Sequence, residues 1–418
     1  MDITSWDWST PVKRVVQADA CDGEAAWLEE PQVSPDGERL ARVAFLDGEY
    51  GLCVNGALGE GTYSRIWYPR FAPDGRITAL ANADGEWTML VDGEAWDTYG
   101  AIWNTLFSGD GSHIAAAVQM DGTYGMAVDN APWETLYENA NHFTLSQDGA
   151  HTAAAVQIEP LGQADVAKFQ GGVFGVAKDG ETWNERYMGV YKMAMSPDGA
   201  QLAAEVRLNL YEYTIAENGK AWSKTFPCVW GPAISPADGK AVAPVRIAGK
   251  WTLAADGKPI WKAAFTQCWH QFFSANGRKL GAIVSPAFGR WTLAIDGNAW
   301  RTTFGDVVED ACFSPDGSRA ACLGKEDGIY AVVVDDVAWP GRYAMAWKPV
   351  FSPDGKHVAA KVEKGGTYTV AVDGREFGSG FTAAFTPVFS PCSTKVLITV
   401  IEDGWLVRRV VPVSSFKA

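Results

Sequence analysis

Histidine and carboxylate side chains are the first residues to consider for chemistry, because they transfer protons and bind metal ions near neutral pH. The chain has only five histidines. His142 and His270 directly follow equivalent positions of a sequence repeat, and Glu29 and Glu309 occupy that same position in two other copies. If folding brought them together, these four side chains could ligate a metal ion or form a general acid–base pair. No local spacing enforces such a meeting, so the sequence marks them only as polar candidates.

Other motifs that carry chemistry are missing from the sequence. It contains no G-x-S-x-G elbow, no Walker loop, no EF-hand loop and no H-E-x-x-H pair. The seven cysteines are scattered without a C-x-x-C spacing, which leaves the usual zinc, haem and iron–sulfur sites without ligands. We therefore expect a protein that is not an enzyme and that has no catalytic residue, cofactor or metal of its own.

A tight turn of the form Ser-Pro-Asp-Gly, with variations, recurs along the chain. The repeat that it marks determines where the polar candidates lie. The last residue of the turn falls at Gly37, Gly75, Gly111, Gly149, Gly199, Gly239, Gly277, Gly317, Gly355 and Ser393. These positions are 36 to 40 residues apart, except for one spacing of 50. Proline fixes φ in such a turn, and glycine takes the positive φ that a tight hairpin requires. Self-similarity at this period indicates ten copies of one supersecondary unit.

Each unit is predicted to contain four short antiparallel strands, because Asp-Gly pairs separate its apolar runs and mark hairpins. Repeated four-stranded sheets without linkers indicate an all-β fold, a β-propeller with ten blades in a single domain over residues 1–418. We expect one ring, closed when the N-terminal segment 1–28 completes the last blade. Two smaller rings or a ring with a decorated edge are the alternatives, and residues 12–17 could form another third strand.

Alignment of the units places 17 of the 19 tryptophans in three aromatic columns. The columns in the third and fourth strands are interpreted as packing between blades. Trp27, which follows Asp22-Gly23, is assigned to the fourth-strand column, as the N-terminal strand that completes the last blade. The remaining column lies four residues before the apolar end of the first strand, at what we call the collar position. It comprises the collar residues Trp67, Trp103, Tyr191, Trp230, Trp269, Trp347 and Phe385. They could seal and pack loops at one mouth of the ring, or they could form a recognition surface.

One unit carries about twelve additional residues, which fall within residues 158–171. Insertions of this kind are tolerated in surface loops. The insertion is therefore either a surface loop without a function of its own or a partner-docking arm with Leu161, Val166 and Phe169 at its tip.

The charge balance disfavours two classes of partner. A net charge of −15 argues against nucleic acid, whose phosphates are bound by Lys and Arg. It argues equally against direct contact with an anionic membrane surface. No run of 18 apolar residues occurs, and the N-terminus lacks the features of a signal peptide, so we expect a cytoplasmic protein without transmembrane insertion.

Two resemblances follow from these patterns. The repeats at 313–317 and 351–355, both Phe-Ser-Pro-Asp-Gly, resemble the WD40-like repeats of TolB-type propellers. The acidic, Trp-rich chain with D-G-x-x-W elements at 92–96, 179–183 and 296–300 is also similar to the D subunit of the Tmc transmembrane electron-transfer complex of sulfate-reducing bacteria. That second resemblance implies an accessory subunit without a cofactor, associated with the membrane through other protein subunits that include a membrane cytochrome b and an iron–sulfur subunit.

The expected function is accordingly that of a non-catalytic scaffold that binds other proteins. The alternative is a propeller enzyme, or a protein that binds a sugar or another small ligand at the aromatic collar.

Overall fold

The computed structural model describes residues 3–23, 25–162 and 165–416. Within these residues the chain forms ten antiparallel sheets, each with four strand positions, and only very short helices. This confirms the predicted fold class, an all-β protein built as a β-propeller of ten blades. The blades fall into two compact units of five, unit 1 (Met1–Thr98 with Arg301–Ala418) and unit 2 (Tyr99–Trp300).

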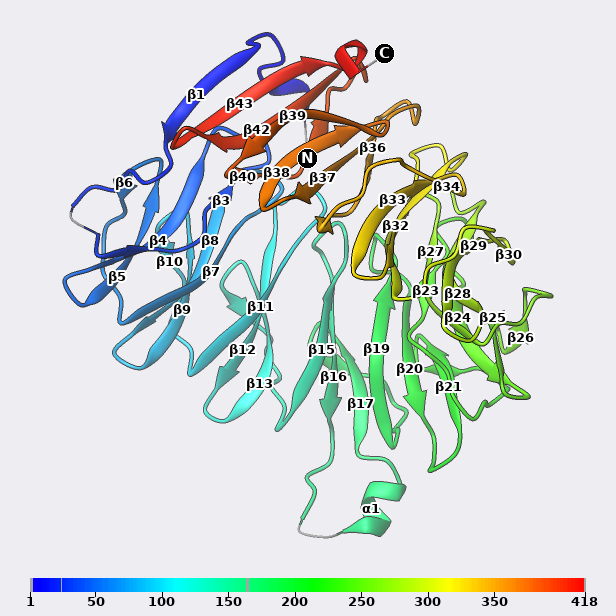
Figure 1. Cartoon of the computed structure of the whole chain (residues 1–418). Coiled ribbons are helices and arrows are strands. Elements are labelled where there is room, and N and C mark those ends of the chain that lie inside the picture. Colours follow the sequence, from blue (N-terminus) through cyan, green and yellow to red (C-terminus); the bar gives the residue numbers. More distant parts are fainter. Residues whose placement is uncertain (1–2, 24, 163–164, 417–418) are drawn as a thin grey trace. The chain divides into compact units, whose positions relative to one another are not determined.

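Unit 2 contains five blades that are consecutive in the sequence. Their strands are β11 (Ala101–Phe107), β12 (Ile114–Met120), β13 (Thr123–Val128) and β14 (Ala131–Pro132); β15 (Ala140–Leu145), β16 (Thr152–Gln157), β17 (Phe174–Lys178) and β18 (Glu181–Thr182); β19 (Gly189–Met195), β20 (Leu202–Arg207), β21 (Tyr213–Glu217) and β22 (Lys220–Ala221); β23 (Ala233–Ile234), β24 (Ala241–Ile247), β25 (Lys250–Ala255) and β26 (Lys258–Pro259); β27 (Gln267–Phe273), β28 (Leu280–Ala287), β29 (Arg290–Ile295) and β30 (Asn298–Ala299). The helix α1 (Val166–Gln170) lies in the long connection between β16 and β17 (Figure 1).

Unit 1 contains the first two and the last three blades of the sequence. Their strands are β2 (Trp27–Leu28), β3 (Gln32–Val33), β4 (Leu40–Leu46), β5 (Glu49–Val54) and β6 (Ala57–Leu58); β7 (Arg65–Phe71), β8 (Ile77–Ala83), β9 (Glu86–Val91) and β10 (Glu94–Ala95); β31 (Val307–Phe313), β32 (Ala320–Glu326), β33 (Ile329–Val334) and β34 (Val337–Ala338); β35 (Met345–Ala346), β36 (Val350–Phe351), β37 (Val358–Lys364), β38 (Thr367–Val372) and β39 (Arg375–Phe381); β40 (Ala383–Ala384), β41 (Val388–Phe389), β42 (Lys395–Glu402), β43 (Trp405–Pro412) and β1 (Val12–Gln17). Two 3-10 helices, η1 (Ile3–Ser5) and η2 (Val413–Phe416), lie near the ends of the chain.

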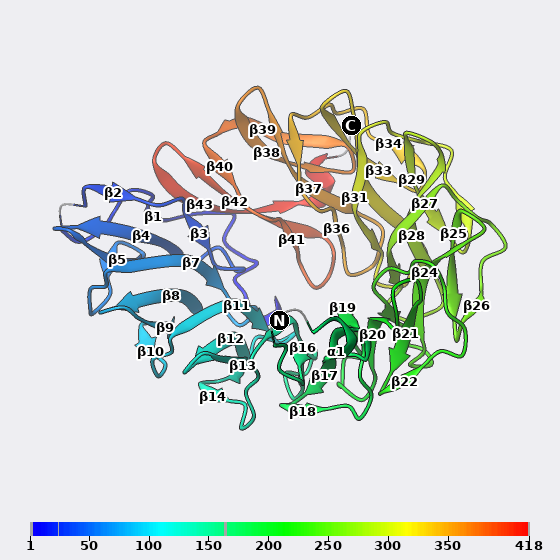
Figure 2. The ribbon, with the colours of Figure 1, turned by 90° about the horizontal axis from the view of Figure 1, so that it is seen from below.

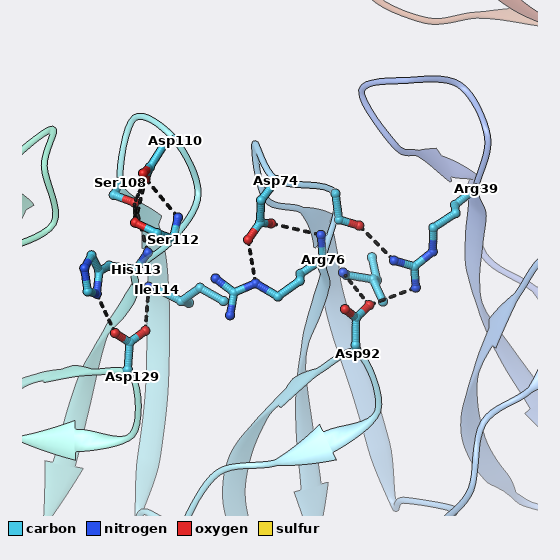
Figure 3. A network of polar contacts seen from close by, with 12 residues as sticks. Arg39, Asp74, Arg76, Asp92, Ser108, Asp110, Ser112, His113, Ile114 and Asp129 are labelled. Carbon is cyan, nitrogen blue, oxygen red and sulfur yellow. Dashed lines mark hydrogen bonds and ion pairs between the residues drawn. The ribbon is translucent and has the colours of Figure 1, made fainter. Parts of the chain in front are cut away.

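The repeated turns are held by side-chain hydrogen bonds, which explains why their residue types recur. In the turn after β11, the Ser108 hydroxyl donates to the Asp110 carboxylate at 2.8 Å and accepts from the His113 backbone N–H at 3.0 Å (Figure 3). The aspartate that opens the last hairpin of this blade, Asp129, accepts from the Ile114 N–H at 3.0 Å and contacts His113 Nδ1 at 2.6 Å. In this blade the turn and the start of the second strand are therefore tied to the residue that follows the third strand.

In unit 1, the aspartate that follows the third strand also joins neighbouring blades. Asp92 accepts from the backbone N–H of Ile77 at 3.1 Å and from Arg39 Nη2 at 2.8 Å (Figure 3). Arg39 follows the turn of the preceding blade, and its Nη1 also donates to the Gly75 carbonyl at 2.8 Å. A single guanidinium thus links two successive blades.

The core lies between the faces of successive blades. The second strands carry most of it, as in β12, where every residue from Ile114 to Val118 is fully buried. A strand covered on both faces appears in the sequence as a continuous apolar run, and its alanines allow the neighbouring sheets to approach closely.

The tryptophans after the fourth strands pack at the outer edges of the blades. Trp133, Trp222 and Trp261 are buried, and Trp96, Trp183, Trp300 and Trp339 are half-buried. The Trp133 indole N–H donates to the Thr152 hydroxyl of the next blade at 2.8 Å. This arrangement supports the packing interpretation of that aromatic column.

The last blade is completed by a strand from the other end of the chain. β1 pairs antiparallel with β43, from Val12 opposite Arg409 to Gln17 opposite Trp405 (Figure 1). Within the expected segment 1–28, the completing strand is therefore β1. Trp27 begins the first strand of the next blade and pairs with Phe45, so it does not belong to the fourth-strand column. Asp22-Gly23 before it imitates the hairpin signal that precedes a fourth strand elsewhere.

No helix of the described residues has the length and apolar character needed to cross a bilayer.

Candidate functional site

The collar position lies directly before a β-bulge in the first strand. In β7, β11, β15, β27 and β31 the register of pairing with the second strand shifts immediately after it. The next residue in these five strands takes a left-handed conformation, with φ between 50° and 55° at Tyr68, Asn104, His142, His270 and Asp310. Bulges of this kind redirect side chains and are frequent at functional sites. The repeat therefore places two consecutive side chains of each blade where regular pairing stops.

Most collar rings rest on the aromatic residue of the third strand in the same blade. The centroid distances are 5.7 Å for Trp67–Trp87, 6.1 Å for Trp103–Tyr124, 6.4 Å for Tyr191–Tyr213, 5.3 Å for Trp230–Trp251, 4.5 Å for Trp269–Trp291 and 5.9 Å for Trp347–Tyr368. Phe385 instead packs against the cluster of Ala18, Leu40, Ile401 and Leu406. Two of the three aromatic columns are therefore one structural feature, in which an inner ring fixes the orientation of a collar ring.

Unit 2 has a pocket of about 540 Å³ at its collar. Its lining residues come from four successive blades and are His142, Tyr191, Lys192, Met193, Glu205, Trp230, Gly231, Pro232, Trp269, His270 and Gln271. Figure 2 shows strands β19–β22, β24–β26 and β27–β29 of three of these blades in succession. Three collar residues and both histidine candidates therefore meet in one place, although they are separated by up to 128 residues in the sequence.

The charged groups of this pocket are close enough to influence one another. Burial lowers the pKa of both His142 and His270, and the positive charge of Lys192 lowers them further. Burial also raises the pKa of Glu205 to about 7, against the opposing effect of Lys192. The pocket thus combines the side chain of Lys192 with two imidazoles whose neutral form is favoured and a carboxyl group whose protonated form is favoured relative to an exposed glutamate.

One amide connects two walls of the pocket. Gln271 Nε2 donates to the Gly231 carbonyl at 2.7 Å and to the Val242 carbonyl at 3.1 Å, both in the preceding blade. This contact fixes the edge beside Trp230 and Trp269. The connecting segment at Trp230 and Gly231 is thereby tied to the next blade.

Unit 1 has a separate pocket of about 470 Å³ at its own collar. Glu29, Trp67, Tyr68 and Arg70 contribute to it. Burial raises the pKa of Glu29, and neighbouring Glu30 raises it further. Among the described residues, none is a hydrogen-bond partner of the buried Glu29 Oε2, while Arg70 lies 5.3 Å from the Tyr68 ring centroid. This surface combines exposed aromatic rings with both signs of charge.

Glu309 occupies the collar position of β31, also in unit 1. It pairs with Leu323, and its charge raises the pKa of Tyr330 after the larger effect of burial. Glu29 and Glu309 are thus both in unit 1, while His142 and His270 line the unit 2 pocket. Among the residues that the structure describes, no group of three or more His, Cys, Asp or Glu side chains is arranged to hold a metal ion.

The insertion lies away from the collar residues in the sequence. Asp165 caps α1 by accepting from the Lys168 backbone N–H at 2.9 Å. Leu161 and Val166 are exposed, and Phe169 is half-buried. Part of the predicted docking arm, residues 163–164, lies outside the described residues.

Sequence reasoning missed Lys192, Glu205 and Gln271. Glu205 lies on the second strand opposite the collar position, where most blades have an aliphatic residue or proline. The blade of β37 has Lys361 at that place, and its ammonium lies 4.0 Å from the Trp347 ring centroid. Alignment of the second strands would have revealed Glu205, because it is a charged residue at a position that is apolar in most blades.

Comparison with known proteins gives similarity only at the level of solved structures. No protein-family model matches the chain, and no curated protein matches it either. A eukaryotic initiation factor is similar at 13% identity with a TM-score of 0.46, over 78% of this chain and 91% of that one. Dihydro-heme d1 dehydrogenase NirN in complex with DHE is similar at 14% identity and a TM-score of 0.36, over 82% of this chain and 74% of that one. The Dos1 propeller is similar at 12% identity and a TM-score of 0.35, over 95% of this chain and 94% of that one.

Proposed function

We propose that this chain is a non-catalytic protein-interaction subunit that binds its partner through collar residues. The observation that carries the proposal is the exposure of Trp67 and Trp230, 46% and 41% respectively, although both rings already pack against an inner aromatic ring. Tryptophan is enriched at interface hot spots because it buries a large area. A ring that is held in place before binding loses little conformational entropy when a partner covers it.

The finer form of the proposal names the partners. The chain would be a cytoplasmic accessory subunit of a membrane-bound electron-transfer complex of the Tmc type, with a membrane cytochrome b and an iron–sulfur subunit as its neighbours. The support is the resemblance in composition and in D-G-x-x-W elements, together with the TolB-like Phe-Ser-Pro-Asp-Gly repeats. A scaffold of this kind needs exposed recognition residues and no redox ligands.

Affinity purification from detergent-solubilised host membranes tests this function. The wild-type chain should recover membrane subunits stoichiometrically, and the double variant Trp67→Ser/Trp230→Ser should lose at least tenfold of that recovery. Phe288→Ser is the matched control, because Phe288 is 94% exposed but lies at the β28–β29 turn. Equal recovery by the collar variant, or loss with the Phe288 variant alone, would contradict the proposal.

A second candidate function is the binding of a small ligand, favoured by the unit 2 pocket. Its volume of about 540 Å³ lies within the range of small-molecule sites, and its walls combine aromatic rings with a few polar groups. Glu205 and the two histidines would also be the acid and base groups of a propeller enzyme.

A further inference from the structure

We propose that the unit 2 pocket binds a small organic anion with a flat ring, which lies on the collar tryptophans and places its negative charge at Lys192. This inference rests on the second candidate function, small-ligand binding, and specifies the class of ligand.

The ring preference follows from Trp230 and Trp269. Trp230 stacks on Trp251 with an interplanar angle of 7° and still leaves 41% of its side chain exposed. Trp269 stacks on Trp291 with ring centroids 4.5 Å apart and is half-buried beside the same pocket. Because both indoles are fixed from behind, a flat ligand ring can cover them without first ordering them.

The charge preference follows from Lys192. It is exposed in the pocket, and within the described residues it forms no ion pair with a carboxylate. Lys192 nevertheless lies near enough to Glu205, His142 and His270 to shift the pKa of each. Because burial favours the neutral form of both imidazoles, Lys192 is the basic group that can supply positive charge to a ligand in this pocket. A ligand with one negative charge complements it.

Glu205 limits how tightly the pocket can bind an anion. Glu205 is buried and lines the same pocket as Lys192, whose charge lowers the Glu205 pKa against the larger effect of burial. When ionised, Glu205 competes with the ligand for Lys192. Removal of this charge should therefore strengthen anion binding, which is the opposite of what loss of a structural residue would do.

Three probes with the same ring and different charge test the inference by isothermal titration calorimetry on the full chain. Benzoate, benzamide and benzamidine carry −1, 0 and +1 charge at neutral pH. Benzoate should bind at least tenfold more tightly than benzamide, and benzamidine should show no saturable binding. Glu205→Gln should bind benzoate more tightly than the wild type does.

Lys192→Met should weaken benzoate binding about tenfold and leave benzamide binding unchanged. Lys348→Met is the matched control, because Lys348 directly follows the collar residue Trp347 in unit 1 as Lys192 follows Tyr191 in unit 2. It should bind benzoate like the wild type, which also shows that a surface lysine can be replaced without loss of the fold.

The possible results distinguish failure of the anion assignment from failure of small-ligand binding by the unit 2 pocket. If benzamide or benzamidine binds best, or if Lys192→Met binds benzoate unchanged, the pocket binds small ligands but the anion assignment is wrong. If none of the three probes binds, small-ligand binding and the anion assignment are both overturned.

Discussion

Replacement of Arg408 by methionine should open the junction between the two ends of the chain. Arg408 lies on β43 and its side chain is fully buried. Its Nε donates to the Asp36 carbonyl at 3.0 Å and lies 3.3 Å from Glu38 Oε1, while its Nη2 donates to the Asp7 carbonyl. One guanidinium thus holds the last blade, the first turn and the N-terminal segment together.

The expected magnitude follows from these contacts. A hydrogen bond that involves a charged group contributes about 1.5–3 kcal/mol, and removal of one partner of a buried ion pair costs about 3–5 kcal/mol. Methionine retains the apolar stem but leaves the Asp36 and Asp7 carbonyls without this donor. We expect Arg408→Met to destabilise this junction by about 3–5 kcal/mol, which corresponds to roughly a hundredfold to a few thousandfold more frequent local opening.

Native-state hydrogen exchange of the backbone amides in β1 and β43 measures that opening directly. Lys13→Met is the matched control, because Lys13 contacts the same Glu38 carboxylate at 2.5 Å but is largely exposed, and an exposed pair contributes about 1 kcal/mol or less. Similar exchange in the two variants, or unchanged protection of β1 in Arg408→Met, would refute the reasoning.

Three other outcomes concern the repeats. Ser352→Ala should lower the free energy of unfolding by about 1–3 kcal/mol, measured by urea titration, because the buried hydroxyl donates to the turn aspartate at 2.6 Å and accepts a backbone N–H at 3.0 Å. The Ser314 hydroxyl holds the pKa of Asp316 at about 2, below its usual 3.8. The ionised Asp316 carboxylate therefore stabilises the folded chain above pH 4, and this stabilisation is lost as the pH falls from 4 towards 2. Urea midpoints over that range should fall less in Asp316→Asn than in the wild type. Trp222→Ala should lower the free energy of unfolding by about 3–5 kcal/mol in the same assay, because Trp222 is buried. Trp27 is 51% exposed, so Trp27→Ala should lower it by less than about 1 kcal/mol. Equal losses would contradict the packing interpretation.

The fold class could be predicted because each blade repeats its local signals. The serine, aspartate and glycine of the turn after β11 all make the contacts that their types suggest, and Gly111 has a positive φ of 85°. The same reasoning failed at Trp27, because Asp22-Gly23 has the residue types of a hairpin but precedes a first strand. The missing fourth strand of the last unit predicted that the N-terminal segment completes this blade, but the local signal pointed to Trp27 rather than to β1, which pairs with β43 almost 400 residues away.

The candidate site could be predicted only in part. The bulge position and its aromatic residues recur at a fixed place in the repeat, so the collar column was visible in the sequence. Which members meet depends on how successive blades pack, and this placed His142 and His270 with Lys192 and Glu205. Glu205 interrupts an apolar second strand, but only its tertiary neighbours explain its raised pKa.

Footprinting of the purified complex by hydrogen exchange tests the central claim, that collar residues are the recognition surface. Binding of the partner should slow exchange at the collar segments, residues 66–70 in unit 1 or residues 190–193 and 229–232 in unit 2, and should leave the β28–β29 turn at 286–290 unchanged. Protection confined to that turn or to the insertion at 158–171, with the collar segments exchanging as in the free chain, would contradict the account.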